Sequence, residues 1–313
     1  MSRHVVFGTG QVGHPLVTHL VAAGHDVVAV NRDGRDSVPG ARTVGGDATD
    51  PAFTAAVSAG AAAVYFCLNA PSYERWSEEF PPLQRGVLAG ARAAGARLVV
   101  LDNLYSYGPP QGRPLVETMP ANPTSAKAAT RAAMTEDLLA AHAAGDVEVA
   151  IGRASDYFGP GADRSAFGET VFEPALRGRT AQVMGRPDQP HSYSFTPDVA
   201  AGLATLGTEP GTTGEIWHLP VDGAPTTRDL VERVYALAGT RSRLMAAGAL
   251  TLRALGMVKP PMREYLHTLY QFTGPWIVDD AKFRGRFHVA ATPVDEALAQ
   301  TLAWFRDRTA VPA

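Results

Sequence analysis

Short apolar runs recur along the first half of the chain, and segments with helical periodicity separate them. The apolar runs predict strands at residues 4–7, 27–30, 64–68, 98–101 and 147–152. Helices are expected between them, at residues 15–23, 53–59 and 83–94 and around Leu138 and Leu139. Short buried strands that alternate with helices are typical of a parallel sheet covered on both faces. The pattern therefore predicts an α/β fold with a doubly wound parallel sheet.

The second half of the chain has a less regular pattern of apolar positions, because proline and glycine interrupt it. Residues 216–219 are expected to return to the sheet as a late strand, and residues 292–305 to close the chain as an amphipathic helix. We therefore expect a sheet domain made of residues 1–155 and 192–220. A smaller, mostly C-terminal substrate lobe, residues 156–191 and 221–313, is expected to be interleaved with it.

Composition narrows the class of protein. The chain has 313 residues, a formal net charge of −3 and one cysteine, Cys67. A charge this close to neutrality is not typical of a nucleic-acid-binding domain, and one cysteine allows neither an internal disulfide nor a multi-cysteine metal site. No apolar run approaches the ~20 residues of a membrane helix, and the N-terminus has no signal-peptide pattern. We expect a cytoplasmic protein, a monomer or homodimer, with a small-molecule substrate and without nucleic-acid, membrane or metal partners.

The first candidate for chemistry is the glycine-rich segment Gly8-Thr9-Gly10-Gln11-Val12-Gly13, which follows the first strand and opens the first helix. In such a G-x-G-x-x-G loop the first glycine permits a tight turn, the second lets a pyrophosphate approach the backbone, and the third allows close helix packing. Its position in the first βαβ unit favours a dinucleotide site over a simple tight turn. Gly8, Gly10, Gln11, Val12 and Gly13 are therefore expected to bind the cofactor of a Rossmann-type domain.

The end of the second strand distinguishes between two cofactors. A carboxylate there binds the ribose hydroxyls of NAD, whereas a guanidinium binds the 2′-phosphate of NADP through paired hydrogen bonds. The chain has Asn31 and Arg32 at this position, with Arg35 close behind. The sequence predicts NADP, with NAD less favoured; the alternative is that Arg32 is only a solvated loop cation.

Further motifs follow in a characteristic order. Residues 45–50 are similar to a G-D-x-x-D segment, residues 107–108 to the end of S-S-x-x-V-Y-G, residues 153–161 to R-P-x-x-x-Y-G-P-G, and residues 195–200 to the start of a V-x-D-V-A helix. With the glycine-rich segment, this ordered set resembles the extended short-chain dehydrogenase/reductase superfamily, in its NAD(P)-dependent epimerase/dehydratase group. The resemblance implies that Asp47 and Ala48 flank the adenine. It also implies that Asn69 lies where the backbone passes the cofactor ribose.

The chain departs from this family at the catalytic positions. The family carries Ser or Thr four residues before the Tyr of its Tyr-Gly pair, and that position is Asn103 here. The family's Tyr-x-x-x-Lys follows a Glu and a Pro, and the spacings from Glu117 and Pro123 place that Tyr at Lys127 and that Lys at Arg131. A rival register keeps Lys127 as the family Lys and puts Pro123 at the Tyr. In both registers the usual catalytic tyrosine is missing.

The spacing of residues in the helix that carries these cations predicts a site independently of the family resemblance. One helical stripe contains Lys127, Arg131, Met134, Leu138 and Ala141. Its apolar part should face the sheet, so the two cations extend towards the C-terminal edge of the strands, where ligands bind in doubly wound folds. The alternative is that both cations are solvated.

The missing tyrosine leaves the proton carrier open. In the family, the tyrosine exchanges the alcohol proton and a nearby lysine holds the nicotinamide ribose. A Lys127 made neutral by burial and by Arg131 can act as a general acid or base or form a Schiff base. A charged Lys127 can only bind an anion or polarise an oxygen, and Asn103 can donate a hydrogen bond to a substrate oxygen. Four tyrosines are candidates for a substitute proton donor, with a packed aromatic ring as the alternative for each: Tyr105, Tyr107, Tyr157 and Tyr193.

We therefore expect an NADP-dependent oxidoreductase or epimerase-like enzyme that acts on a small oxygenated metabolite. Lys127, Asn103 and Arg131 are its expected catalytic residues, and Lys127 is also expected to contact the cofactor. The alternative is an NADP-binding protein with a non-redox role, as an isomerase, a cyclase or a regulator.

Overall fold

The computed structural model describes residues 1–35, 38–72, 74–258 and 260–310. Contacts between residues divide the chain into two compact units. The first comprises Met1–Ser106, Ser125–Ala154 and Val199–Leu219, and the second comprises Tyr107–Thr124, Ser155–Asp198 and Pro220–Ala313. Residues 107–124 and 192–198, expected from the sequence to belong to the sheet domain, make their contacts in the second unit. The domain division expected from the sequence remains a prediction.

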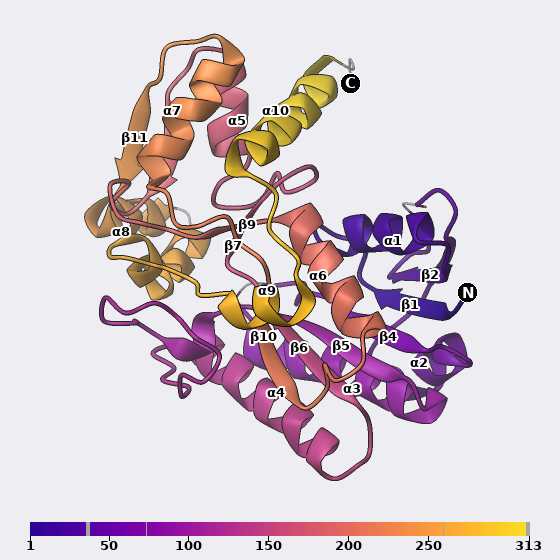
Figure 1. Cartoon of the computed structure of the whole chain (residues 1–313). Coiled ribbons are helices and arrows are strands. Elements are labelled where there is room, and N and C mark those ends of the chain that lie inside the picture. Colours follow the sequence, from indigo (N-terminus) through magenta and orange to yellow (C-terminus); the bar gives the residue numbers. More distant parts are fainter. Residues whose placement is uncertain (36–37, 73, 259, 311–313) are drawn as a thin grey trace. The chain divides into compact units, whose positions relative to one another are not determined.

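The first unit is built on a seven-stranded parallel sheet with the order β10-β6-β5-β4-β1-β2-β3 (Figure 1). Its strands are β1 (Arg3–Phe7), β2 (Asp26–Asn31), β3 (Arg42–Gly45), β4 (Ala63–Phe66), β5 (Arg97–Asp102), β6 (Val149–Arg153) and β10 (Glu215–His218). Its helices are α1 (Gly13–Ala22), α2 (Pro51–Ser58), α3 (Trp76–Ala94), α4 (Ala126–Ala143), the short η1 (Tyr105–Tyr107, shared with the second unit) and most of α6 (Thr196–Thr208). The predicted α/β fold with a doubly wound parallel sheet is confirmed.

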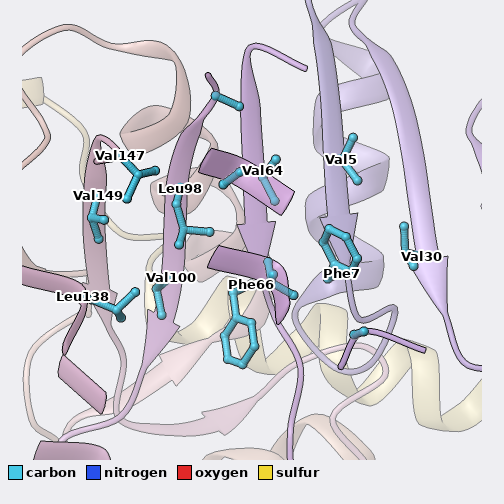
Figure 2. Packing of buried hydrophobic residues seen from close by; sticks show 14 of the residues in the cluster. Val5, Phe7, Val30, Val64, Phe66, Leu98, Val100, Leu138, Val147 and Val149 are labelled. Carbon is cyan, nitrogen blue, oxygen red and sulfur yellow. The ribbon is translucent and has the colours of Figure 1, made fainter. Parts of the chain in front are cut away.

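Both faces of this sheet are buried, which explains why its strands are apolar along their whole length. Successive side chains of a strand point to opposite faces. Val5 and Phe7 of β1 share one face with Val64 and Phe66 of β4, as Figure 2 shows. Residues of α2, α3 and α4, among them Leu138, pack on this face.

On the opposite face the buried side chains of His4 and Tyr65 belong to a chain of polar groups that continues to the half-buried Ser2 and His25. Nδ1 of His4 lies 3.0 Å from the Tyr65 hydroxyl, and Nε2 of His4 lies 2.9 Å from the hydroxyl of Ser2, which in turn lies 3.0 Å from Nδ1 of His25. Burial lowers the pKa of His4 to about 4, and the neighbouring His25 adds to the effect. Gly207 of α6 packs on Tyr65 so closely that a Cβ there would overlap the tyrosine hydroxyl.

Acidification is expected to destabilise the first unit through His4. The unfolded chain takes up a proton at this side chain near pH 6.5 and the folded chain only near pH 4, so the unfolded state binds more protons between these values. The free energy of unfolding therefore falls as the pH is lowered from 6.5 to 4, by about 2–4 kcal/mol from His4 alone. Urea denaturation at several pH values measures this slope. His4→Asn should lose most of it, and an undiminished slope in that variant would refute the assignment.

The second unit contains two short parallel pairs of strands, β8 (Ala181–Met184) with β11 (Leu244–Ala247) and β7 (Asp156–Phe158) with β9 (Tyr193–Phe195). Its helical elements are α5 (Glu169–Leu176), α7 (Thr227–Ala238), α8 (Ala249–Val258), η2 (Pro260–His267), η3 (Leu269–Phe272), α9 (Ala281–Phe287) and α10 (Val294–Ala310). α10, expected at residues 292–305, packs on α5 through stacked rings of Phe172 and Phe305, 5.2 Å apart. Within the described ranges, no helix is long and apolar enough to cross a membrane.

Candidate active site

The C-terminal ends of the parallel strands form one edge of the sheet, and the candidate residues lie along it. Gly8 follows β1, Asn31 ends β2, Asn103 follows β5 and Arg153 ends β6. Ligands of doubly wound sheets bind outside this edge, because the loops and helix N-termini that follow the strands converge there. Gly8, Asn31 and Asn103, three of the residues predicted from the sequence, therefore lie at this edge of the sheet.

The glycine-rich loop has the backbone geometry that a dinucleotide requires. Gly8 has a φ of +99°, and a Cβ there would lie 2.6 Å from the carbonyl oxygen of Cys67. A Cβ at Gly13 would overlap the carbonyl oxygen of Gly8, whereas no atom lies within 4 Å of a Cβ built at Gly10. Val12 is buried and anchors the loop, and Gln11 is half-buried. The loop is thus closed by its first and third glycines and open at the second, as expected for a backbone that a pyrophosphate approaches.

The loop after β2 is organised by Asn31. Its Oδ1 accepts a hydrogen bond from the backbone N–H of Gly34 at 2.7 Å, and its Nδ2 donates to the hydroxyl of Thr9 at 3.1 Å and to the carbonyl of Arg35. Asn31 therefore ties this loop to the glycine-rich loop. Arg32 is exposed beside them.

Asp47 and Asn69 shape neighbouring turns at the same edge. Asp47 Oδ1 accepts hydrogen bonds from the backbone N–H and the hydroxyl of Thr49, both at 2.8 Å. These bonds, with a smaller contribution from the charge of Arg32, lower the pKa of Asp47. Ala48 is buried, and Asn69 is exposed with its Oδ1 accepting the N–H of Ala70 at 3.0 Å.

Cys67 follows β4, and its backbone carbonyl lies beside Gly8. Burial raises the pKa of its thiol to about 12, so the reactive thiolate is scarce at neutral pH. Within the part of the chain that the structure describes, no group of three or more His, Cys, Asp or Glu side chains could hold a metal ion.

The two cations of α4 are buried. Lys127 is 6% exposed and Arg131 is 3% exposed, and Met134 and Leu138 continue the same buried stripe. The helix begins after Ser125, whose hydroxyl caps it by accepting the N–H of Ala128 at 3.2 Å. The alternative that both cations are solvated is therefore excluded, and Lys127 lies in the first turn of α4.

Arg131 belongs to an ion-pair network centred on Asp102, a residue that was not among the predicted site residues. The carboxylate of Asp102 accepts from Nε of Arg131 at 2.7 Å and from Nε of Arg153 at 2.9 Å. Nη2 of Arg131 also bonds Asp102 and donates to the carbonyl of Leu101 at 3.1 Å, and the hydroxyl of Thr135 donates to Asp102 at 3.3 Å. Burial alone would raise the pKa of Asp102, but the two guanidinium charges outweigh it and lower the pKa.

The network joins three elements at the sheet edge. Asp102 and Arg153 are partners in the β5–β6 register, and Arg131 comes from α4. The guanidinium of Arg131 also lies over the ring of Phe80 of α3, 4.6 Å from its centre. Its Nη1 is buried without a hydrogen-bond partner among the described residues, so the two N–H groups of this nitrogen are not used by the network.

Asn103 and Tyr105 form the turn after β5. The Oδ1 of Asn103 accepts the N–H of Tyr105 at 3.0 Å, which leaves the Nδ2 of Asn103 as a donor. The ring of Tyr105 stacks on Trp76 with their centres 5.9 Å apart. Of the four candidate tyrosines, Tyr105 is the one that lies in the first unit with Lys127.

The other three tyrosines belong to the second unit. Tyr107 lines a hollow of about 450 Å³, as do Arg113 and Asn122. All residues that line this hollow lie in the segment between β5 and α4. Tyr193 shares a hydrogen bond of 2.9 Å with Thr227, and burial raises its pKa. Tyr157 is half-buried.

Comparison of the sequence with known families and proteins gives consistent matches. The profile of the NAD dependent epimerase/dehydratase family matches residues 5–219. A 3-diazoavenalumate denitrifying reductase of a Streptomyces species is 30% identical over 267 residues, which cover 80% of this chain and 86% of the relative. A UDP-glucose 4-epimerase of Mycolicibacterium smegmatis is 27% identical over 252 residues, 74% of this chain and 80% of the relative.

Solved structures share the fold. The dTDP-glucose 4,6-dehydratase of Bacillus anthracis in complex with NAD superimposes with a TM-score of 0.79 at 13% identity, over 98% of this chain and 97% of that one. A dTDP-glucose 4,6-dehydratase of Streptomyces venezuelae with NAD bound gives a TM-score of 0.78 at 20% identity, over 98% of each chain.

Proposed function

Because this chain belongs to the NAD dependent epimerase/dehydratase family, we propose that it is an NADP-dependent oxidoreductase or epimerase-like enzyme that acts on a small oxygenated metabolite. One observation supports the proposal: the open glycine-rich loop follows β1, and α4, which carries the buried Lys127, is bonded through Arg131 to Asp102 at the end of β5 in the same parallel sheet. The edge at which these strands end is where this class of fold binds dinucleotides and reacts them with substrates.

The residues at this edge suit NADP. The backbone of Gly8, Gly10, Gln11, Val12 and Gly13 would hold the pyrophosphate, helped by the N-terminus of α1. Arg32, with Asn31 shaping its loop, would hold the 2′-phosphate, while Asp47, Ala48 and Asn69 would line the adenosine. When bound, the nicotinamide supplies or accepts a hydride.

Lys127, Asn103 and Arg131 are the proposed catalytic residues. The Nζ of Lys127 would hold the proton that a substrate oxygen gains or loses, and it would also contact the cofactor. The Nδ2 of Asn103, left available by the turn at Tyr105, would donate a hydrogen bond to the same oxygen. Arg131 would give its remaining Nη1 donor to the cofactor ribose, with its guanidinium held in place by Asp102.

Arg32→Ala is expected to weaken NADP binding by about 1.5–3 kcal/mol, the usual worth of a hydrogen bond to a charged group. Affinity for NAD should barely change, because NAD lacks the 2′-phosphate. Titration calorimetry of both cofactors on both proteins measures the difference. Arg85→Ala, which removes an exposed arginine of α3, is the matched control. A wild-type preference for NAD, or an equal loss of both cofactors in Arg32→Ala, would show that Arg32 does not select NADP.

Turnover is tested by incubating the protein with NADPH and a panel of aldehydes and ketones, following nicotinamide absorbance and product mass. We expect oxidation of NADPH with at least one carbonyl compound. The absence of the family tyrosine favours a second candidate, an NADP-binding protein whose role is a non-redox isomerisation, cyclisation or regulation. Tight NADP binding with unchanged absorbance across the panel would support that second candidate.

A further inference from the structure

An exposed apolar face stands out on α8 of the second unit. Leu250 is 80% exposed and Met257 is 74% exposed. Leu250, Arg253, Ala254 and Met257 are spaced i, i+3, i+4 and i+7, so they share one side of the helix, and all four are exposed. Leu252, on the other side, is buried and packs against Leu269 and Phe272. α8 is thus anchored by one face and presents a second apolar face outward.

The strand before this helix extends the exposed apolar surface. Met245 of β11 is 53% exposed, and β11 precedes α8 directly in the chain (Figure 1). Leu250 and Met257 share one exposed side of α8, and Met245 is an exposed large apolar side chain in the strand that leads into this helix. Scattered single exposures need no explanation, but a gathered apolar surface marks an interaction site.

The segment of residues 241–263, which contains β11 and α8, has a net positive charge, unlike the rest of the chain. Residues 241–263 contain five basic and no acidic residues, whereas the rest of the chain has 23 basic and 31 acidic residues. Arg241, Arg243 and Arg253 are exposed. None of these three arginines forms an ion pair with another residue in the described ranges. The exposed arginines of this segment, Arg241, Arg243 and Arg253, therefore keep their positive charge without an acidic partner in the described part of the chain.

We propose that α8, with Met245, Arg241 and Arg243, docks on an anionic lipid surface. A helix that carries apolar residues on one exposed side and basic residues beside them lies in the lipid interface, with its apolar side chains among the acyl chains. Basic residues next to it are attracted to anionic headgroups. This association is peripheral, in contrast to the absence of membrane contact expected from the sequence, and it is independent of the proposed redox function.

Other occupants fit this face less well. A second copy docked through the same face would bring the arginines of both copies together, because a two-fold contact repeats one patch on both subunits. A protein partner is usually held by aromatic anchors in pockets. Residues 241–258 contain no aromatic residue that could serve as such an anchor.

Vesicle co-sedimentation of the full chain tests the proposal. The vesicles are phosphatidylcholine alone, or phosphatidylcholine with about a third phosphatidylglycerol. We expect sedimentation only with the anionic vesicles, and release at about 1 M salt, where the Debye length falls to about 3 Å. Leu250→Ser/Met257→Ser should weaken binding at least tenfold. Arg241→Gln/Arg243→Gln/Arg253→Gln should weaken it about 100-fold, at about fivefold for each basic residue lost.

Matched variants separate this surface from general effects. Leu237→Ser removes an exposed leucine of α7 that lies outside the proposed face, and Arg42→Gln/Arg85→Gln/Arg164→Gln removes the same charge from other exposed positions. Both controls should sediment like the wild type, and circular dichroism should show all variants folded.

Four outcomes would overturn the proposal. The first is the absence of sedimentation with anionic vesicles at low salt, and the second is an equal loss of binding in the control variants. The third is a soluble dimer that Leu250→Ser/Met257→Ser dissociates, which would assign the face to a second copy. The fourth is binding to polyglutamate without binding to vesicles, which would assign the face to an acidic protein.

Discussion

Lys127→Met is expected to lower kcat by about 10²–10⁴, the range that a positioned acid–base group contributes. Lys127 is buried in the first turn of α4, and the spacings from Glu117 and Pro123 align it with the family's tyrosine. Methionine has a similar length and no proton to exchange, so it removes the chemistry with little change in packing. NADP affinity should stay within a few-fold, which calorimetry can check separately from turnover.

Lys127→Arg distinguishes a proton carrier from a fixed charge. Arginine keeps the positive charge but does not lose its proton in proteins, so a proton carrier would lose activity in this variant and a charge that only polarises the substrate oxygen would keep part of it. Lys282→Met of α9 is the control, because the chain has only three lysines and this one lies in the second unit. An unchanged kcat in Lys127→Met would move the proton to a tyrosine, with Tyr105 the first to test.

Asp102→Asn is expected to lower the free energy of unfolding by about 3–5 kcal/mol, the usual effect of breaking a buried ion pair from one side. The variant leaves the two buried guanidinium groups of Arg131 and Arg153 facing a neutral amide. Arg131→Met should be less destabilising, because Asp102 and Arg153 still balance one another. Urea denaturation measures both.

The exposed pair Arg92–Asp146 supplies the control for Asp102. Asp146 is about half exposed, and Asp146→Asn should change stability by no more than about 1 kcal/mol. Asp102→Asn could instead lower the free energy of unfolding as little as Asp146→Asn, or less than Arg131→Met. Either result would show that Asp102 does not hold the ion-pair network together.

What could be predicted from the sequence depended on whether the signal was local. The strands of the sheet centre are continuous apolar runs, so β1, β2, β4, β5 and β6 were all expected. β3 was not expected, because Arg42–Gly45 is a short edge strand with exposed ends. The buried stripe of α4 was visible because its period is local to one helix.

The ion-pair network escaped prediction because its members meet only through the sheet. Asp102 and Arg153 are 51 residues apart and become neighbours through the parallel pairing of β5 and β6. The available signal was an acid and a base that each end an apolar run, but nothing in the sequence says which runs pair. The side of α4 that carries Arg131 was therefore predictable, and its partner was not.

Asp102, Arg131 and Arg153 also constrain how such an active site could evolve or be redesigned. Lys127→Tyr with Arg131→Lys would give α4 the family's usual pair. The second change would replace a guanidinium that bonds Asp102 through two nitrogens with a single ammonium group. Residues in one network are not independent under mutation, so position 102 would have to change together with position 131. A redesign that changes position 131 alone is therefore expected to be less stable than one that changes positions 102 and 131 together.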